Sequence, residues 1–171
     1  MLNKQFIRKQ FLNKRNELSP AMRNELSNVI AKKIITMIDD NDFENIGIYK
    51  TITSEVNTEE IINWCNENKF NLFFPVINEN TDTIEFKSQN DELKVNLDLI
   101  IVPLVSFDKE LNRLGRGKGH FDKFINTLNY KTFLVGIAYD IQKYEHTLPI
   151  EKHDQKLNLI ITELNDYYKT V

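Results

Sequence analysis

Short apolar segments, bounded by polar or turn residues, constrain the fold of this chain more than any other feature. The clearest is LDLIIVP (97–103), which is apolar at nearly every position and therefore indicates a strand buried on both faces. Helices are predicted between such segments, one capped by Thr58 and one at HFDKFINTL (120–128). This alternation predicts an α/β fold with a mostly parallel central sheet flanked by helices on both faces. The other predicted strands are IGIYK (46–50), FNLFFPVI (70–77), IEFK (84–87, in a side hairpin), TFLVGIAY (132–139) and LNLIIT (157–162).

Two helices are predicted before the first strand. The first covers residues 3–18, where Lys4, Arg8 and Arg15 fall within about 40° of one another and form a basic stripe. The second begins at Ser19-Pro20, a serine cap followed by proline at the first helical position. The residues of this second helix that we expect to face the core are Met22, Leu26, Val29, Ile30, Ile34, Met37 and Ile38.

The whole chain, residues 1–171, is predicted to form one domain, because its length suits a single core and no linker or repeat interrupts it. Cys65 is the only cysteine, which excludes an internal disulfide and favours a reducing compartment. No apolar run approaches the roughly 18 residues of a transmembrane helix, so we expect a cytoplasmic protein with no membrane partner. The net charge of −3 argues against a nucleic-acid partner, and we expect a monomer.

Three of the five glycines lie at alternate positions in RLGRGKGHFD (113–122). The spacing fits neither the P-loop, which needs GK followed by Ser or Thr, nor the dinucleotide fingerprint GxGxxG. Alternate glycines nevertheless let successive backbone N–H groups face one anion, and the interspersed Arg and Lys add charge. Asp122 would suit a magnesium ion whose other ligands are phosphate oxygens. From residue types alone, a phosphate site and a solvated turn are equally open.

The longer stretch VPLVSFDKELNRLGRGKGHFDKFI closely resembles the signature of the 5-formyltetrahydrofolate cyclo-ligase family, approximately VPGxAFD followed by RLGxGxGYYDxxL. KQFIR resembles the family's N-terminal K-x-x-x-R, IGIYKTITSEVNTEEII its strand and Glu-bearing loop, and HDQKLNLIIT its closing segment. The resemblance spans nearly the whole chain. It implies ATP- and magnesium-dependent cyclisation of 5-formyltetrahydrofolate to 5,10-methenyltetrahydrofolate, with release of ADP and phosphate through a phosphorylated formyl (imidate phosphate) intermediate.

The resemblance also implies roles for individual residues. The implied magnesium ligands are Asp122 and Asp154, and the implied catalytic cations are Arg113 and Lys118. The implied ATP contacts are Lys4, Arg8, Arg113, Leu114, Gly115, Arg116, Gly117, Lys118, Gly119, His120 and Phe121. The implied folate contacts are Lys50, Glu55, Arg116, Gly117, Lys118, Gly119 and His120.

Four residues keep ordinary alternatives. Without the resemblance, Asp154 would be a turn residue and Glu55 a loop acid beside a helix N-terminus. Phe107 could wall the pterin pocket or lie in the core. Arg15 lies on the basic stripe but matches no residue with a role in the family.

The chain departs from the family pattern in two places. His120-Phe121 stands where two tyrosines are usual, so the hydroxyl of the second is absent, and Leu104 stands where glycine is usual. Two rival functions are also open. One is a nucleotide- or RNA-binding module that is not an enzyme, and the other is a family relative that keeps the ATP loop but acts on another acceptor, with Glu55 as the discriminating residue.

Overall fold

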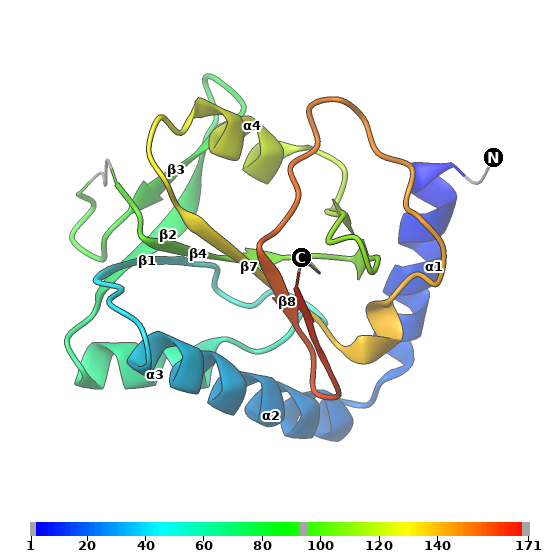
Figure 1. Cartoon of the computed structure of the whole chain (residues 1–171), viewed down its shortest axis with the longest axis horizontal. Coiled ribbons are helices and arrows are strands. Elements are labelled where there is room, and N and C mark those ends of the chain that lie inside the picture. The colour runs from blue at the N-terminus through cyan, green and yellow to red at the C-terminus, as the bar shows by residue number, and fades with distance from the viewer. Residues whose placement is uncertain (1–2, 93–95, 169–171) are drawn as a thin grey trace.

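The computed structural model describes residues 3–92 and 96–168, which form a seven-stranded sheet surrounded by helices (Figure 1). The strands of this sheet, in spatial order, are β3 (Thr83–Lys87), β2 (Asn71–Asn78), β1 (Asn45–Ile48), β4 (Leu99–Pro103), β7 (Phe133–Ile137), β8 (Leu159–Ile161) and β9 (Asp166–Tyr168). Strands β5 (Ser106–Phe107) and β6 (Arg113–Leu114) form a separate hairpin. The helices are α1 (Lys4–Glu17), α2 (Pro20–Asp39), α3 (Glu59–Glu67), α4 (His120–Thr127) and the 3-10 turn η1 (Asp140–Gln142).

The sheet is mostly parallel, as predicted. Strands β2, β1, β4, β7 and β8 run parallel, whereas β3 and β9 pair antiparallel with their neighbours at the two edges. Every predicted apolar segment contains a strand, and the 84–87 segment forms the expected hairpin with β2. The short strands β5, β6 and β9 were not predicted, because two or three residues carry no periodicity of their own.

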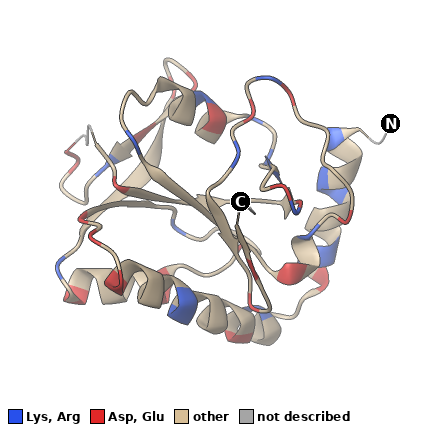
Figure 2. Cartoon of the chain, viewed as in Figure 1, with Lys and Arg blue, Asp and Glu red and all other residues tan. Residues whose placement is uncertain are grey.

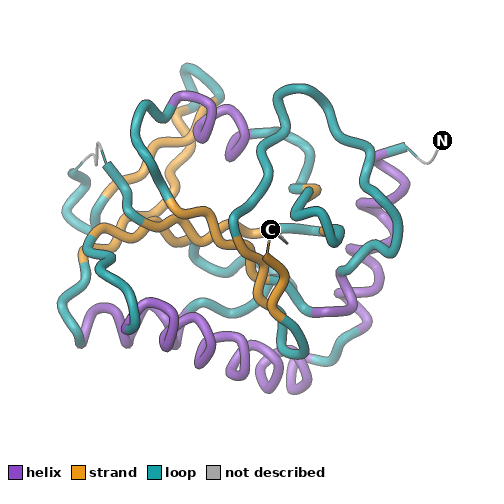
Figure 3. The backbone as a smooth tube through the Cα atoms, in the orientation of Figure 1, coloured by secondary structure: helices purple, strands orange, loops and turns teal. Residues whose placement is uncertain are grey.

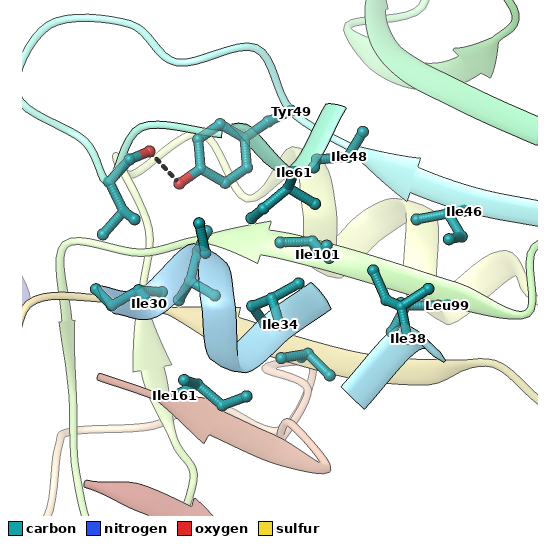
Figure 4. Packing of buried hydrophobic residues seen from close by; sticks show 14 of the residues in the cluster. Ile30, Ile34, Ile38, Ile46, Ile48, Tyr49, Ile61, Leu99, Ile101 and Ile161 are labelled. Atoms are coloured by element: carbon teal, nitrogen blue, oxygen red, sulfur yellow. Dashed lines mark hydrogen bonds between the residues drawn. The ribbon is translucent and has the colours of Figure 1, made fainter. Parts of the chain in front are cut away.

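Alternate strand residues face opposite sides of the sheet, and each side is covered by helices (Figure 3). Ile101 of β4 faces α2 and α3 and packs with Ile34 and Ile38 of α2 (Figure 4). Its neighbour Ile100 faces the other side, where α4 supplies partly buried apolar side chains such as Phe124. The continuous apolar strands are therefore apolar because both of their faces are buried, which confirms the predicted architecture.

The predicted core face of α2 is partly wrong. Ile30, Ile34 and Ile38 are buried, but Met22 is 45% exposed and Val29 is 40% exposed. Val29 is rotated by about 100° from Ile30, so the two cannot share a narrow stripe that faces the sheet. Met22 lies in the first turn, which leaves it at the exposed end of the helix. Leu26 and Met37, the remaining members of the predicted set, are partly buried against the core.

Helix α1 lies beside the β5–β6 hairpin, near the carboxyl ends of the parallel strands, and not on a face of the sheet (Figure 1). Its buried residues Ile7 and Phe11 pack against Val105 and Leu114. No helix within the described residues is both long and apolar enough to cross a membrane. Thr58 precedes α3 as predicted but does not cap it, because its hydroxyl donates to the Tyr49 carbonyl oxygen at 2.8 Å.

Candidate active site

A cavity of about 1310 Å³ opens at the carboxyl ends of β1, β2 and β4. Parallel sheets bind ligands at this edge, because the loops that follow the strands gather there. The first turns of α1, the loop between β6 and α4 and the 149–154 loop complete the wall. The structure thus brings together every residue assigned to ATP, folate or magnesium from the sequence, although their roles stay predictions. These residues are Lys4, Arg8, Lys50, Glu55, 113–122 and Asp154.

The β5–β6 hairpin delivers Arg113 into the cavity. The buried carboxylate of Asp108 holds the hairpin turn, since its Oδ1 accepts hydrogen bonds from the N–H groups of Glu110 (2.9 Å) and Asn112 (3.1 Å). Its Oδ2 accepts from the Leu148 N–H at 2.8 Å. An aspartate that bonds the backbone two residues ahead is a strong turn former. The turn therefore sets where β6 begins and where the glycine loop leaves it.

The glycine loop, residues 115–119, owes its shape to two of its three glycines. Gly117 and Gly119 have φ values of 111° and 66°, which residues with side chains rarely adopt, whereas Gly115 does not need this freedom. Gly119 is also the N-cap residue of α4, directly before its first residue, His120. The Arg8 Nε donates to the Gly115 carbonyl oxygen at 2.8 Å, which fastens the loop to α1.

Lys4 is paired with two acids of the 149–154 loop. Its Nζ lies 2.6 Å from Asp154 Oδ2 and 2.9 Å from Glu151 Oε1. Burial alone would lower the pKa of Lys4, but the two carboxylates outweigh it and raise the pKa. Burial alone would raise the pKa of Asp154. Hydrogen bonds from Lys4 and from the Glu151 N–H outweigh this effect and lower the pKa. Sequence reasoning missed Glu151, because no motif marked it; its place three residues before Asp154 was the available signal.

Arg113 and Asp122 form the most buried ion pair of the cavity. The Arg113 Nη2 lies 3.0 Å from Asp122 Oδ1, and its Nη1 donates to the Gln155 carbonyl oxygen at 2.6 Å. The same Asp122 Oδ1 accepts the Gln155 N–H at 3.0 Å. Burial lowers the pKa of Arg113, and the charge of Asp122 opposes that shift. The Arg113 side chain is 3% exposed, so its guanidinium is held in one orientation.

The predicted magnesium ligands fit a cation that phosphates share. No group of three or more acids, histidines or cysteines placed to hold a metal occurs among residues 3–92 and 96–168. Magnesium often takes only one or two carboxylates and completes its shell with phosphate oxygens and water. Asp122 Oδ2 accepts no hydrogen bond from a described residue, and nor does Asp154 Oδ1, which the exposed His153 Nε2 approaches only to 3.8 Å. Two carboxylates, each with a spare oxygen, therefore fit a metal that arrives with a polyphosphate.

Glu55 and Arg116 bridge the β1–α3 loop and the glycine loop. The Arg116 Nε and Nη2 donate to Glu55 Oε1 at 3.2 and 3.0 Å, and Nη2 also reaches Thr53 Oγ1 at 2.9 Å. The Ile52 N–H donates to Glu55 Oε2 at 3.1 Å, and the Tyr139 hydroxyl donates to the Glu55 carbonyl oxygen at 3.1 Å. Both carboxylate oxygens of Glu55 are thus occupied, and its backbone is fixed from the other side.

The three residues that depart from the family pattern, His120, Phe121 and Leu104, have different surroundings. The His120 Nε2 lies 2.9 Å from Asp82 Oδ1 in the β2–β3 turn, a contact that the sequence did not indicate. The Phe121 ring meets Phe86 edge-on, with centroids 6.2 Å apart, so its face of α4 packs on the sheet. Leu104 lines the cavity but is 4% exposed.

Arg15 and Phe107, whose roles were open, do not line the cavity. Phe107 is completely buried and packs against Tyr167, which confirms the core alternative. Arg15 is 2% exposed, although it shares a stripe of α1 with Lys4 and Arg8. The basic stripe of α1 is therefore split between two environments. Lys4 and Arg8 line the cavity, whereas Arg15 lies in the interior.

The fold and the cavity define a class of protein. Cations outnumber acids along the cavity wall although the chain has a net charge of −3, and α1 presents a row of them (Figure 2). An α/β sheet with such a cavity at its carboxyl edge is typical of enzymes that act on anionic small molecules.

The profile of the 5-formyltetrahydrofolate cyclo-ligase family matches residues 1–93 and 83–163. The chain belongs to this family, which confirms the resemblance and makes the protein an enzyme of the cyclo-ligase class. The non-enzymatic binding module is thereby excluded.

Individual relatives match over most of their length. The 5-formyltetrahydrofolate cyclo-ligase of Mycoplasma genitalium is 31% identical over 94% of this chain and 98% of its own. The solved 5,10-methenyltetrahydrofolate synthetase of Mycoplasma pneumoniae superposes with a TM-score of 0.87 at 29% identity, covering 95% of this chain and 99% of its own. The synthetase of Aquifex aeolicus gives a TM-score of 0.83 at 26% identity, covering 98% and 93%.

Proposed function

We propose that the protein converts 5-formyltetrahydrofolate to 5,10-methenyltetrahydrofolate, using ATP and Mg²⁺ and releasing ADP and phosphate. One observation carries the proposal: the residues that match the family motifs, scattered from Lys4 to Asp154 along the chain, converge on one cavity. The cavity is also large enough for two ligands, since single drug-sized ligands occupy sites of about 300–1,000 Å³.

The ATP side of the cavity is the side of α1 and the glycine loop. Lys4 and Arg8 lie one helical turn apart on α1, so both can contact one polyphosphate. The backbone of the loop offers N–H groups, and its glycines leave room for close approach. Arg113 is held ready to orient a phosphate, whereas the exposed Lys118 can follow one.

The folate side is the side of β1, β2 and the β1–α3 loop, residues 49–58, which carries Glu55 and is called the Glu55 loop below. A carboxylate can accept hydrogen bonds from the amino and ring N–H groups of a pterin, and Glu55 is the acid placed to do so. Apolar side chains of β2 and of the Glu55 loop line the adjoining wall, and Lys50 lies 4.8 Å above the ring of Phe74. Arg116 already contacts Glu55, so substrate binding and rearrangement of the glycine loop are coupled.

The chemistry needs no protein nucleophile. The formyl oxygen attacks the γ-phosphorus of ATP and ADP leaves, giving the imidate phosphate; N10 then attacks the formyl carbon and loses its proton. The C–O bond breaks as phosphate departs, and the ring is closed. Arg113 and Lys118 stabilise the charge on the transferred phosphoryl group, and the cavity holds the two substrates in line.

Asp122 and Asp154 would hold the magnesium ion. A bound Mg²⁺ would supply positive charge beside the transferred phosphoryl group. In the absence of phosphates the two carboxylates are balanced by Arg113 and Lys4. As part of the proposal, the protein works as a cytoplasmic monomer with no nucleic-acid or membrane partner.

The test is one spectrophotometric assay of the purified protein with 5-formyltetrahydrofolate and Mg-ATP. The expected result is the near-ultraviolet absorbance of methenyltetrahydrofolate, formed only when both substrates are present. A folded sample that gives no product at high enzyme concentration contradicts the proposal. Turnover of ATP with another formylated acceptor, with 5-formyltetrahydrofolate inert, would favour a relative of different specificity.

A further inference from the structure

Arg15 of α1 is a deeply buried cation that the proposed mechanism does not use. Its Nε donates to Ser54 Oγ at 3.0 Å, and its Nη1 donates to the Leu104 carbonyl oxygen at 3.3 Å. Its Nη2 is buried and finds no hydrogen-bond partner among the described residues. Desolvating a guanidinium is costly, and an unpaired buried nitrogen adds to that cost. Packing alone therefore does not explain why a cation occupies this position.

The surroundings of Arg15 connect it to Glu55. Ser54, its hydrogen-bond partner, directly precedes Glu55 in the loop. Burial lowers the pKa of Arg15, and the carboxylate of Glu55 is the largest charge that opposes this shift. Glu55 is 8% exposed, and its partner Arg116 is 46% exposed in its side chain. Glu55 therefore has one cation in direct contact, Arg116, which is accessible from the cavity, and a second cation, Arg15, which is buried behind the loop and bonded to the adjacent Ser54.

We infer that Arg15 is a positioning residue for folate binding: it provides the fixed counter-charge of Glu55 and fastens the Glu55 loop to α1. Arg116 is then the exchangeable partner, which a ligand displaces. The inference rests on the proposed contact between Glu55 and the folate. When pterin N–H groups replace Arg116, the carboxylate loses its contacting cation, and Arg15 remains as the fixed cation behind the loop. A buried charge is costly unless a charge of opposite sign or hydrogen bonds compensate it.

The contacts of Arg15 allow its function to be separated from stability. Ser54 Oγ also donates to Asn16 Oδ1 at 2.5 Å, and the Leu104 carbonyl oxygen also accepts from Gln142 Nε2 at 2.9 Å. Both partners thus keep a hydrogen bond when the guanidinium is removed. In the ligand-free protein Glu55 also keeps Arg116 as its direct partner, so removing Arg15 does not leave the carboxylate unpaired. Arg15→Met should therefore fold with an unchanged melting temperature.

The experiment compares wild type, Arg15→Met and Arg15→Lys in the cyclisation assay. We expect Arg15→Met to raise the KM for 5-formyltetrahydrofolate by about tenfold or more, with the KM for ATP unchanged. Arg15→Lys keeps the charge and should recover much of the affinity. The control is Lys14→Met, the neighbouring cation of α1, which contacts Phe11 and not the Glu55 loop. It should leave both KM values unchanged.

A second cycle tests whether Arg15 acts through Glu55. In the Glu55→Gln background no carboxylate needs balancing, so adding Arg15→Met should change the folate KM little. Arg15→Gln replaces Arg15→Met if the latter does not fold. Three outcomes overturn the inference: an unchanged folate KM in the neutral variants, equal losses of affinity for folate and ATP, or full additivity with Glu55→Gln. In each of these cases wild-type turnover still supports the proposed function. Absence of wild-type turnover overturns both.

Discussion

The cations of the cavity differ in how freely their side chains can move. Arg113 is held by Asp122 and by the Gln155 carbonyl oxygen, so under the proposed function it loses little side-chain entropy when it orients a phosphate. Lys118 and Lys50 are exposed and make no ion pair with the described acids, so they remain available to a ligand. Under the proposed function, the fixed cation sets the geometry of the phosphoryl group and the mobile cations follow its changing charge.

Asp122→Asn tests the predicted metal site at the scale of one atom. Asparagine keeps an oxygen for the Gln155 N–H but removes the negative charge opposite Arg113. We expect turnover to fall by about a hundredfold or more, because the metal would lose a charged ligand, while the fold is retained. The measurement is turnover against Mg²⁺ concentration, with circular dichroism to check folding. Asp91→Asn, an exposed acid paired with Lys87 outside the cavity, is the control; equal activities in both variants remove Asp122 from the metal site.

Cys65 should be chemically inert in the folded protein. It is completely buried, and burial raises the pKa of its thiol to about 12. The reactive species is the thiolate, which is scarce at neutral pH under these conditions. A chromogenic thiol reagent should therefore label it only after urea unfolds the protein. Rapid stoichiometric labelling of the native protein would contradict this burial.

At the scale of elements, the glycine loop owes its shape to particular glycines. Gly117→Ala forces a side chain into a φ of 111°, so we expect it to lower the free energy of unfolding by about 1 kcal/mol or more. A Cβ at Gly115 meets no atom within 4 Å, and its φ is ordinary, so Gly115→Ala should be neutral or slightly stabilising. Urea denaturation of the two variants gives the comparison. Equal effects would show that the loop does not hold this conformation.

The sequence predicted those elements whose signal is local. Apolar runs such as 97–103 and 132–139 are long enough to identify buried strands, and the order of elements gives a parallel sheet. The β5–β6 hairpin was missed because its turn depends on a buried aspartate, Asp108, whose partners include the distant Leu148. Likewise, the residues that match motifs identified the cavity wall, whereas the partners of those residues could not be predicted. Asp82, Glu151 and Arg15 acquire their contacts only through folding, because they lie far in sequence from what they touch.

At the scale of the whole molecule, Asp140 links the end of β7 to the β8–β9 hairpin. It accepts hydrogen bonds from the hydroxyls of Tyr167 (2.7 Å) and Thr162 (2.8 Å) and from Asn165 (3.3 Å). Burial would raise the pKa of Asp140, but these hydrogen bonds outweigh it and lower the pKa below its ordinary value of 3.8. A lowered pKa contributes stability above the ordinary value, and this contribution is lost as the pH falls through the folded-state value.

Asp140→Asn should therefore destabilise the protein by about 1–2 kcal/mol at pH 7 and by less in acid. Urea denaturation at pH 7 and below pH 3.8 measures both effects. Asp42→Asn, an exposed acid, is the control and should leave stability unchanged at both pH values. A loss of stability that is the same at the two pH values would show that the ionised carboxylate of Asp140 is not what matters.

The assignment of residues 1–171 to one domain stays a prediction.

The internal pairing of Lys4, Arg113 and Arg116 with acids has a consequence for which anions the cavity admits. A phosphate or substrate that draws Lys4 or Arg116 toward itself takes a partner from Asp154 or Glu55, and one that binds the fixed Arg113 weakens the charge balance at Asp122. A bare anion such as sulfate does this and supplies no cation or N–H donor in exchange. Under the proposed function, Mg-ATP brings a divalent cation to the first two acids, and the pterin brings N–H donors to the third. Binding of Mg-ATP and the folate then gives each carboxylate a new partner, whereas binding of a free anion does not. The ligand-free cavity therefore favours the substrates over free anions before any catalytic step.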